Sequence, residues 1–384
     1  MELTRDVVRQ FVPRSVQDEV LAKLTVDPEK ASGATDTQPP RRRLEMRAVD
    51  LSAESGTAED LFDESWPAWR SWYLREGDRA RPSLAECRRQ LTRHMPELMP
   101  VWERLSQRVR PGDDLAARFL SQYRPPALTS ACSNLALPEP ALLRNYDYDP
   151  DLFDSLVTRT DYLRPVVGTS DQFWGLLDGV NDAGLAASFT FGGREAEGDG
   201  FGVPLVIRYL LETCENVHEA ASVLRRIPVH VPYNVTVVDA AGNHATVFVG
   251  PDRDAGVTAS RVTTNHQESV DWPEHAARIG SVTRLSRLSD LVADTPDHEA
   301  AATCMLSSPM RAERYDIGFG TLYTAVMLPV EHVVEYRWPG STWRLSCDAF
   351  EEGTHVVEVP EERSGGRWAW AGSSGARAWA PAAS

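Results

Sequence analysis

Cys132 is the residue of this sequence best suited to covalent chemistry. It stands in the run Ser130-Ala131-Cys132-Ser133, at the beginning of a strand-like stretch. A cysteine thiol is a good nucleophile when its surroundings favour the thiolate, but a lone cysteine is also a common small residue of a hydrophobic core. The neighbouring motifs therefore have to decide between these two interpretations.

Two further polar motifs accompany the cysteine along the chain. Arg144 and Asp147 stand three residues apart, one expected strand after Cys132, and Asn265 follows a strand in the run Thr264-Asn265-His266. Taken alone, an Arg-x-x-Asp pair is usually an ordinary ion pair, and an asparagine after a strand is usually a turn residue. On their own, these two motifs therefore do not assign a function.

These side chains must be positioned by elements of two kinds. Residues 59–120 show helical spacing, with Ser83 as an expected cap, Glu86 three residues later, and Pro96 and Pro100 as breaks. From Leu128 onward, short apolar runs alternate with turns, and this pattern predicts strands. Helices are expected at 204–213, 217–226 and 276–293. Strands and helices are thus grouped rather than strictly alternating, which predicts an α+β fold.

Composition limits the classes of partner. The chain has 384 residues and a formal net charge of −16, which disfavours nucleic acid or an anionic membrane as the main partner. No stretch approaches the roughly 18 apolar residues of a membrane helix, and the N-terminus has no apolar signal core, so a cytoplasmic protein is expected. The five cysteines and nine histidines show no metal-ligand spacing, and no cofactor or metal is expected.

Several motifs in series resemble one known family. The small-Cys-Ser run and the Arg-Asn-x-Asp-x-Asp run are followed by 175–185, 238–242, 262–266 and 320–326, in family order. This series resembles the acyl-coenzyme A:6-aminopenicillanic acid acyltransferase family of N-terminal-nucleophile hydrolases, a group that includes penicillin V acylase, bile salt hydrolase and acid ceramidase. The resemblance covers roughly residues 60–340.

The resemblance implies a fold and an activation step. The fold would be a four-layer αββα sandwich with a helical pro-segment, and the precursor would cut itself between Ala131 and Cys132. The implied segments are a poorly ordered extension (1–50), the pro-segment (51–131), the catalytic domain (132–362) and a flexible tail (363–384), with the two cut chains remaining together as a heterodimer. The freed α-amine, with an ordinary pKa of about 7.7–8.0, would act as a base near neutral pH.

The resemblance also implies roles for individual residues. Arg144 looks like the arginine that favours the thiolate, Asp147 like the carboxylate that orients the α-amine, and Asn265 like the oxyanion donor. Arg284, in a Ser-x-x-Arg pattern, looks like a residue that fixes the active site, with Arg287 as an alternative.

A second set of residues is expected to line the substrate site. Asn234 and His266 are candidates, and each could equally be structural. Where the bile-acid and penicillin acylases carry an asparagine, this chain has Phe189-Thr190-Phe191, so either Thr190 or the backbone replaces that amide, or the acyl pocket differs. For this reason the substrates of those enzymes are not transferred to this chain.

Other functions stay open at this point. A papain-like hydrolase would pair Cys132 with His266 without any self-cleavage, although the local sequence signature of that class is missing. A non-catalytic binding protein with the same fold would have no need for Cys132, Arg144, Asp147 and Asn265 together. The sequence predicts an enzyme that cleaves or forms an amide bond of a small molecule, and it does not separate hydrolysis from acyl transfer.

Overall fold

The computed structural model of the chain describes residues 41–52, 57–127, 129–315 and 319–360. The expected flexible extension up to residue 40 and the tail from residue 361 lie outside the described residues. One part of the expected extension is wrong, because Arg41–Asp50 forms the strand β1. Leu44, Met46 and Ala48 are buried there and alternate with more exposed residues, which is the period of a strand with one covered face.

The N-terminal helical segment forms where the sequence predicts it. It contains α3 (Thr57–Tyr73), η2 (Asp78–Ala80), α4 (Leu84–His94), η3 (Pro96–Leu98), α5 (Met99–Val109) and α6 (Asp114–Leu120). Ser83 caps α4, where its side chain accepts a hydrogen bond from the Glu86 amide at 3.2 Å. Pro96 and Pro100 stand in the first turns of η3 and α5, where a missing amide hydrogen costs nothing.

The larger described sheet has nine strands. Neighbouring strands within it run antiparallel, except for the parallel pair β1 and β4. Its order is β10 (Arg253–Thr258), β9 (His244–Gly250), β8 (Tyr233–Asp239), β7 (Leu185–Phe191), β6 (Gly175–Asn181), β5 (Pro165–Asp171), β4 (Leu156–Asp161), β1 and β16 (Gly353–Pro360).

The second sheet carries Cys132. Its order is β11 (Val262–Thr263), β2 (Ala131–Ala136), β3 (Leu142–Tyr148), β13 (Phe319–Leu328), β14 (Val333–Trp338) and β15 (Ser341–Ser346), and β12 (Glu313–Arg314) pairs with β13. The short η4 (Pro150–Leu152) follows β3. In the antiparallel pair of β2 and β3, Cys132 stands opposite Tyr146 and Ala131 stands opposite Asp147.

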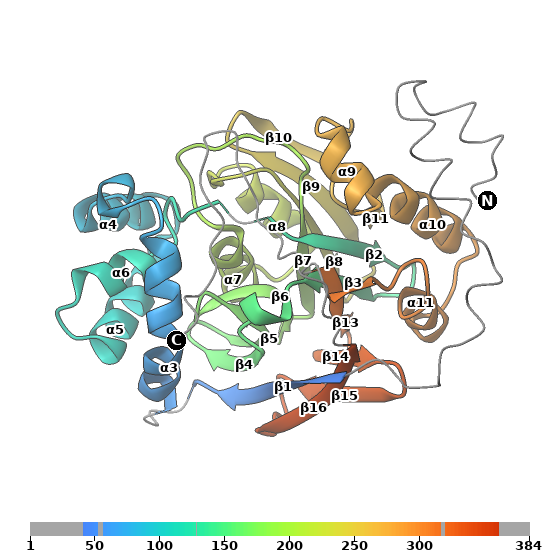
Figure 1. Cartoon of the computed structure of the whole chain (residues 1–384), viewed down its shortest axis with the longest axis horizontal. Helices are drawn as coiled ribbons and strands as arrows, with labels where there is room; N and C mark the ends of the chain where they lie inside the picture. Colours follow the sequence, from blue (N-terminus) through green and yellow to red (C-terminus); the bar gives the residue numbers. More distant parts are fainter. Residues whose placement is uncertain (1–40, 53–56, 128, 316–318, 361–384) are drawn as a thin grey trace, which may run out of the picture. The chain divides into compact units, whose positions relative to one another are not determined.

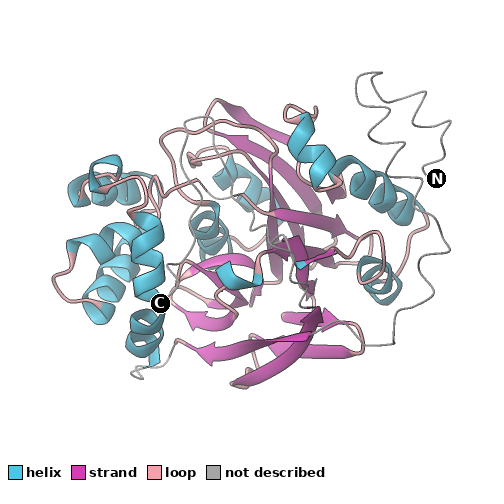
Figure 2. Cartoon of the chain, viewed as in Figure 1, coloured by secondary structure: helices cyan, strands magenta, loops and turns pink. Residues whose placement is uncertain are grey.

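The two sheets stack between two layers of helices, as Figures 1 and 2 show. The helices α7 (Val203–Thr213) and α8 (Val217–Leu224) cover the nine-stranded sheet, whereas α10 (Ser281–Ala293) and α11 (His298–Met305) cover the second one. The expected αββα arrangement is confirmed. The helix expected at 276–293 is divided, because Gly280 adopts a left-handed conformation (φ 63°) between α9 (Pro273–Arg278) and α10.

Side chains of β2 alternate between two environments. Cys132 and Ala136 belong to the large core between the sheets, and Asn134 accepts a hydrogen bond from Ser188 of β7 in the facing sheet. Leu135 belongs to a separate core cluster with Leu288 of α10. This alternation assigns every polar residue of β2 and β3 either to an inner face, between the sheets, or to an outer face, beneath the helices.

Candidate active site

The thiol of Cys132 lies on the inner face and is fully buried in the continuous chain. Arg144 of β3 donates a hydrogen bond from Nη2 to the Cys132 Sγ at 3.2 Å. The Ser130 hydroxyl lies 3.6 Å from the same sulfur atom. The nucleophile candidate therefore has a cation on one side and a hydroxyl group on the other.

The Arg144 guanidinium is held from the facing sheet. Its Nη1 donates to the Asp178 Oδ2 of β6 at 2.8 Å, and both side chains are fully buried. The rings of Tyr146 and Phe189 lie 4.7 and 4.9 Å from the guanidinium carbon. Burial alone would lower the pKa of Arg144, but the nearby Cys132, Tyr323 and Asp178 raise this pKa well above its ordinary value. Arg144 is thus a permanent positive charge beside the sulfur atom.

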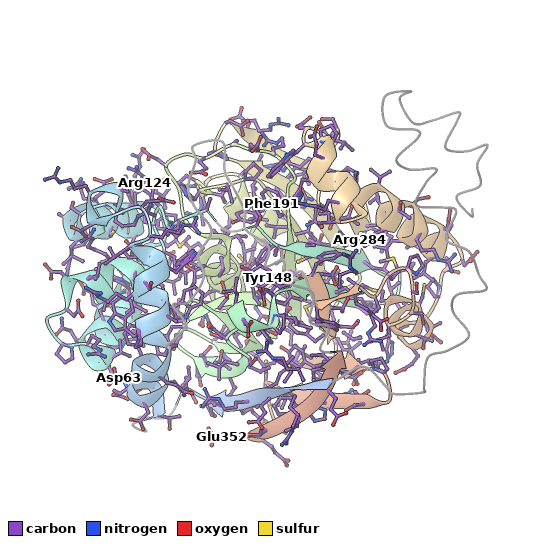
Figure 3. All side chains as sticks on the ribbon, in the orientation of Figure 1. Asp63, Arg124, Tyr148, Phe191, Arg284 and Glu352 are labelled. Carbon is purple, nitrogen blue, oxygen red and sulfur yellow. The ribbon has the colours of Figure 1, made fainter. Side chains whose placement is uncertain are left out.

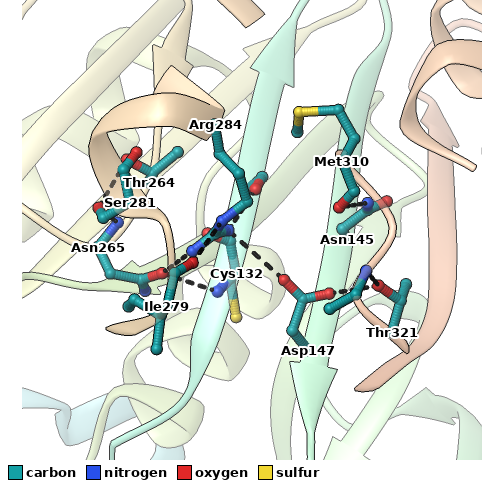
Figure 4. Close-up of polar contacts among 12 residues, drawn as sticks. Cys132, Asn145, Asp147, Thr264, Asn265, Ile279, Ser281, Arg284, Met310 and Thr321 are labelled. Carbon is teal, nitrogen blue, oxygen red and sulfur yellow. Dashed lines mark hydrogen bonds and ion pairs between the residues drawn. The ribbon is translucent and has the colours of Figure 1, made fainter. Parts of the chain in front are cut away.

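Asn265 spans the expected cleavage junction, as Figure 4 shows for its contact with Cys132. Its Oδ1 accepts a hydrogen bond from the Cys132 amide at 3.1 Å, and its Nδ2 donates to the Ser130 carbonyl at 3.2 Å and to the Phe191 carbonyl at 3.4 Å. One side chain therefore contacts the residues on both sides of Ala131. Such an arrangement fixes the orientation of the Ala131–Cys132 peptide relative to the thiol.

Arg284 and Ser281 hold Asn265 from one turn of α10. Arg284 donates from Nη2 to the Asn265 Oδ1 at 2.7 Å and from Nη1 to the Cys132 carbonyl, also at 2.7 Å (Figure 4). The Ser281 hydroxyl accepts a hydrogen bond from the backbone N–H of Asn265 at 2.9 Å. Arg284 is buried in the protein interior (Figure 3), whereas the alternative candidate Arg287 is exposed. The Ser-x-x-Arg pattern thus supplies two contacts to the same asparagine.

Asp147 lies beside Arg284 and Thr321 in the continuous chain, and its role in orienting the α-amine stays a prediction. Its carboxylate lies 3.4 Å from Arg284 Nη1 and accepts from the Thr321 hydroxyl at 2.6 Å, and the Cys132 amide contacts Asn265 instead. Arg144 and Asp147 lie on opposite faces of β3, because residues three apart on a strand point to opposite faces. Burial raises the pKa of Asp147 against the opposing influence of Arg284 and Thr321.

Asn234, Thr190 and His266 surround the loop that carries Asn265. The Asn234 amide donates to the Thr264 and His266 carbonyls, at 2.9 and 3.0 Å, and the Thr190 hydroxyl donates to the Thr264 carbonyl at 2.6 Å. All these contacts are made to protein groups of the loop rather than to an open cavity. Asn234 and Thr190 thus support the backbone on which Asn265 is mounted.

His266 does not pair with the thiol in the part of the chain that the structure describes. Its Nδ1 lies 2.8 Å from the Ser281 hydroxyl and 3.4 Å from the Thr264 hydroxyl. Burial, and secondly Arg284, lower the pKa of His266, so it is neutral at physiological pH. The Cys–His pair that a papain-like hydrolase requires is not formed in this geometry.

Sequence analysis missed three residues of the site: Asp178, Ser281 as a partner of Asn265, and Tyr323. The Tyr323 hydroxyl donates to the Asp178 Oδ2 at 2.7 Å, so Asp178 receives both a tyrosine and the Arg144 guanidinium. A signal for Asp178 exists in the sequence, because it is the only charged residue in the otherwise apolar and small run 175–180. A carboxylate buried in a strand requires a cationic partner.

Among the described residues, no group of three or more His, Cys, Asp or Glu side chains is arranged to hold a metal ion. None of the helices in these described ranges is both long and apolar enough to cross a bilayer.

Comparison with known proteins supports the same family as the motifs. Residues 137–343 match the family described as acyl-coenzyme A:6-aminopenicillanic acid acyl-transferase. The match begins at residue 137, just after Cys132. The assignment of Cys132 as a nucleophile candidate therefore depends on the contacts described above. No curated protein matches the chain in sequence.

Solved structures of low sequence identity resemble part of this chain. A variant of the conjugated bile acid hydrolase from Clostridium perfringens is 13% identical over 62% of this chain and 98% of its own, with a TM-score of 0.42. Penicillin V acylase from Agrobacterium tumefaciens is 15% identical over 60% of this chain and 91% of its own, with a TM-score of 0.41.

Proposed function

Because this chain belongs to the acyl-coenzyme A:6-aminopenicillanic acid acyl-transferase family, and is thus an enzyme that acts on amide bonds, we propose that Cys132 is its nucleophile. We further propose that the chain activates itself by cutting the Ala131–Cys132 peptide bond. The observation that carries this proposal is the position of Asn265, which contacts both the Cys132 amide and the Ser130 carbonyl. An ordinary structural cysteine does not require a side chain that forms hydrogen bonds on both sides of its preceding peptide bond.

The self-cleavage step uses groups that already surround the junction. The Cys132 Sγ attacks the Ala131 carbonyl carbon, the bond between that carbon and the Cys132 nitrogen breaks, and the nitrogen takes up a proton as the new α-amine. Water then attacks the resulting thioester, releasing the Ala131 carboxylate and the free thiol. Arg144, at 3.2 Å from the sulfur, stabilises its negative charge before the attack.

The cut changes what Asn265 can do. Its Nδ2 loses the Ser130 carbonyl when that segment is released, and the freed N–H can donate to the oxyanion of a substrate carbonyl. Its Oδ1, held by Arg284, remains 3.1 Å from the nitrogen that becomes the α-amine. We propose that Asn265, rather than Asp147, orients this amine, and that Asp147 positions Arg284.

Turnover would then follow two half-reactions. The Cys132 α-amine accepts the thiol proton, the thiolate attacks the amide carbonyl of the substrate, and the departing amine receives the proton. The acyl thioester is resolved by water in hydrolysis or by a second amine in acyl transfer. Both outcomes leave Cys132 unchanged, so the same residues serve either reaction.

The two cut chains should stay together as a heterodimer. The N-terminal helices share their core with the rest of the protein, as in the edge-to-face contact of Phe62 with Phe173, whose ring centroids are 4.9 Å apart. Trp174 also donates from its indole nitrogen to the Leu120 carbonyl at 2.7 Å. Separation would expose this shared core, which is strongly unfavourable.

The proposal is tested by the intact mass of the denatured protein, compared with Cys132→Ala and with the control Cys304→Ala. Cys304 is a free, half-buried cysteine on α11. We expect two fragments meeting at Ala131 and Cys132 in the wild type and in the control, and one intact chain in Cys132→Ala. An intact wild-type chain, or a cut that survives in Cys132→Ala, would contradict the proposal.

A further inference from the structure

A small pocket lies beside the thiol on the inner face. Its volume is about 20 Å³, enough for a single water-sized group. Ser130, whose hydroxyl is 3.6 Å from the Cys132 sulfur, forms part of its wall, and so does Phe189, whose ring packs on Arg144. The pocket therefore borders two side chains that contact the thiol or its arginine, and its other walls include Pro125, Tyr146, Asp171 and Tyr233.

The wall of this pocket contains a buried carboxylate without a cationic partner. Asp171 is 3% exposed and forms no ion pair among the described residues, and its Oδ2 accepts only from the Gln172 amide, at 3.2 Å. The Gln172 Oε1 is buried as well and has no hydrogen-bond partner within the part of the chain that the structure describes. Two acceptors, one charged and one neutral, are thus left without an adequate donor in the same wall.

The hairpin holds these acceptors in place. Gln172 and Phe173 both have positive φ, 52° and 75°, in the turn between β5 and β6. Behind the turn, a Cβ at Gly175 would lie 2.5 Å from Pro204 and 2.7 Å from Gln122, so the hairpin tip is tightly packed there. The acceptors are therefore fixed in position rather than free to turn toward solvent.

The groups facing Asp171 are mostly aromatic or acidic. Tyr146 and Tyr148 of β3, Tyr233 of β8 and the acidic Asp154 all interact electrostatically with Asp171. Among the described residues, Arg144 is the cation that influences it, and that guanidinium is already bound to Asp178 and Cys132. Burial raises the pKa of Asp171 to about 6, so the carboxylate is still mostly ionised near neutral pH.

The pocket lies on the acyl side of the reaction. In self-cleavage the acyl group belongs to Ala131, and the residues that lead to it, including Pro125, Pro126 and Ser130, line the pocket. The same thiol attacks a substrate from the same direction, so the substrate's acyl half should follow the path of this segment. Release of the segment after the cut would enlarge the pocket.

We propose that Asp171 and Gln172 bind a protonated amino group carried by the acyl half of the substrate. Two acceptors match the N–H donors of an ammonium group, and the ring of Tyr233 in the same wall provides an electron-rich surface that attracts a cation. This inference rests on the proposed function. It specifies the substrate as an amide with an amino-substituted acyl chain.

The test compares matched anilide substrates on the purified, cut enzyme. Each ω-aminoalkanoyl 4-nitroanilide, from 4-aminobutyryl to 6-aminohexanoyl, is paired with the neutral anilide in which a methyl group replaces the ammonium group. We expect kcat/KM to favour the ammonium member by at least about tenfold in the wild type, and Asp171→Asn to abolish this preference through KM. Gln172→Met should weaken it, and Asp182→Asn, an exposed carboxylate on the next hairpin, should leave it unchanged.

A direct binding measurement tests the same site even if the enzyme turns over none of the anilides. Calorimetric titration with n-pentylammonium should show saturable binding to the cut wild type and at least about tenfold weaker binding to Asp171→Asn. Equal affinity for both proteins, no binding to either, or a kcat/KM preference that survives in Asp171→Asn would overturn the inference. The intact mass of the same preparations reports self-cleavage separately, so failure of the pocket and failure of the nucleophile are distinguishable.

Discussion

The two faces of β2 and β3 carry different kinds of charge. On the inner face, Arg144 contacts the thiol directly and is bound by one carboxylate, Asp178, across the gap between the sheets. On the outer face, Arg284 contacts no sulfur atom and instead joins the Cys132 carbonyl, Asn265 and Asp147. Both arginines are buried, yet the pKa of Arg144 is raised, whereas burial lowers that of Arg284.

This difference separates chemistry from positioning. The inner arginine, Arg144, stabilises the Cys132 sulfur, which carries negative charge in the proposed reaction. The outer arginine distributes its donors over groups that do not react, and it holds the Cys132 backbone and Asn265 in register. Strand alternation explains the division, because adjacent residues of β2 serve opposite faces. The comparison predicts that the two arginines fail in different ways when replaced.

The largest effect is expected for Arg144→Lys. A lysine keeps a charge for Asp178 but cannot reach both Asp178 and the sulfur with separate N–H groups, so turnover should fall by at least about 100-fold. Alkylation of Cys132 by iodoacetamide in the cut protein, followed by peptide mass, should slow as well. Arg208→Lys is the matched control, since Arg208 is equally buried but binds Glu212 and Thr160 away from the site. Normal alkylation in Arg144→Lys would remove this residue from the chemistry.

An effect of similar size is expected for Asn265→Ala, which removes the side chain shared by the cut and by turnover. Loss of an oxyanion donor typically costs about 10²–10³ in rate. The fraction of cut protein should fall too, because the hydrogen bonds that orient the Ala131–Cys132 peptide are lost. Asn145→Ala is the control, since the Asn145 amide is equally buried but binds the Met305 carbonyl beneath α11. Intact mass and turnover measure the two effects, and full cleavage at an unchanged rate would contradict the bridging role.

A smaller and different effect is expected for Arg284→Lys. Self-cleavage and turnover should fall by about tenfold, because Asn265 and the Cys132 carbonyl lose one of their charged donors. Alkylation of Cys132 in the cut protein should remain close to the wild-type rate. Arg287→Lys, one turn along the same helix on its exposed side, should be neutral. Equal loss of alkylation in Arg284→Lys and Arg144→Lys would abolish the distinction between the two faces.

Much of this arrangement was predictable from local patterns. Helix caps, proline breaks and alternating apolar runs depend on neighbours in sequence, and the αββα layers follow from them once the family motifs are recognised. The strand β1 was missed although Leu44, Met46 and Ala48 alternate with polar residues, because charges dominate its composition. A strand of this kind is stabilised by pairing with β4 and β16, which lie far away in sequence.

The details of the site could be predicted only in part. Cys132, Asn265 and Arg284 were found because each stands in a recognisable motif, and the structure brings them together. The face of the sheet on which Asp147 lies depends on strand register and on α10, neither of which a three-residue spacing reveals. Asp178 was missed for the same reason, since its partner Arg144 comes from the facing sheet.

The smallest expected effect concerns stability and contrasts the two buried aspartates. Asp147 has a cationic partner, whereas Asp171 has none among the described residues. The folded pKa of Asp171 is raised to about 6, above its ordinary value of 3.8, so the folded state holds this proton more tightly than the unfolded chain does. As the pH rises from about 4 to above 6, the unfolded chain releases the proton first, and folding stability decreases.

Asp171→Asn should therefore raise the free energy of unfolding by roughly 1–3 kcal/mol at pH 7.5, and the gain should vanish near pH 3, where the carboxyl is protonated in both states. Urea denaturation measures this difference when the proteins with Asp171 and with Asp171→Asn are compared. Both carry Cys132→Ala, which keeps the chain continuous. Asp182→Asn provides the control for an exposed carboxylate. A loss of stability at pH 7.5 would mean that Asp171 has a stabilising partner in the protein itself, which would leave an incoming ammonium group no uncompensated charge to bind.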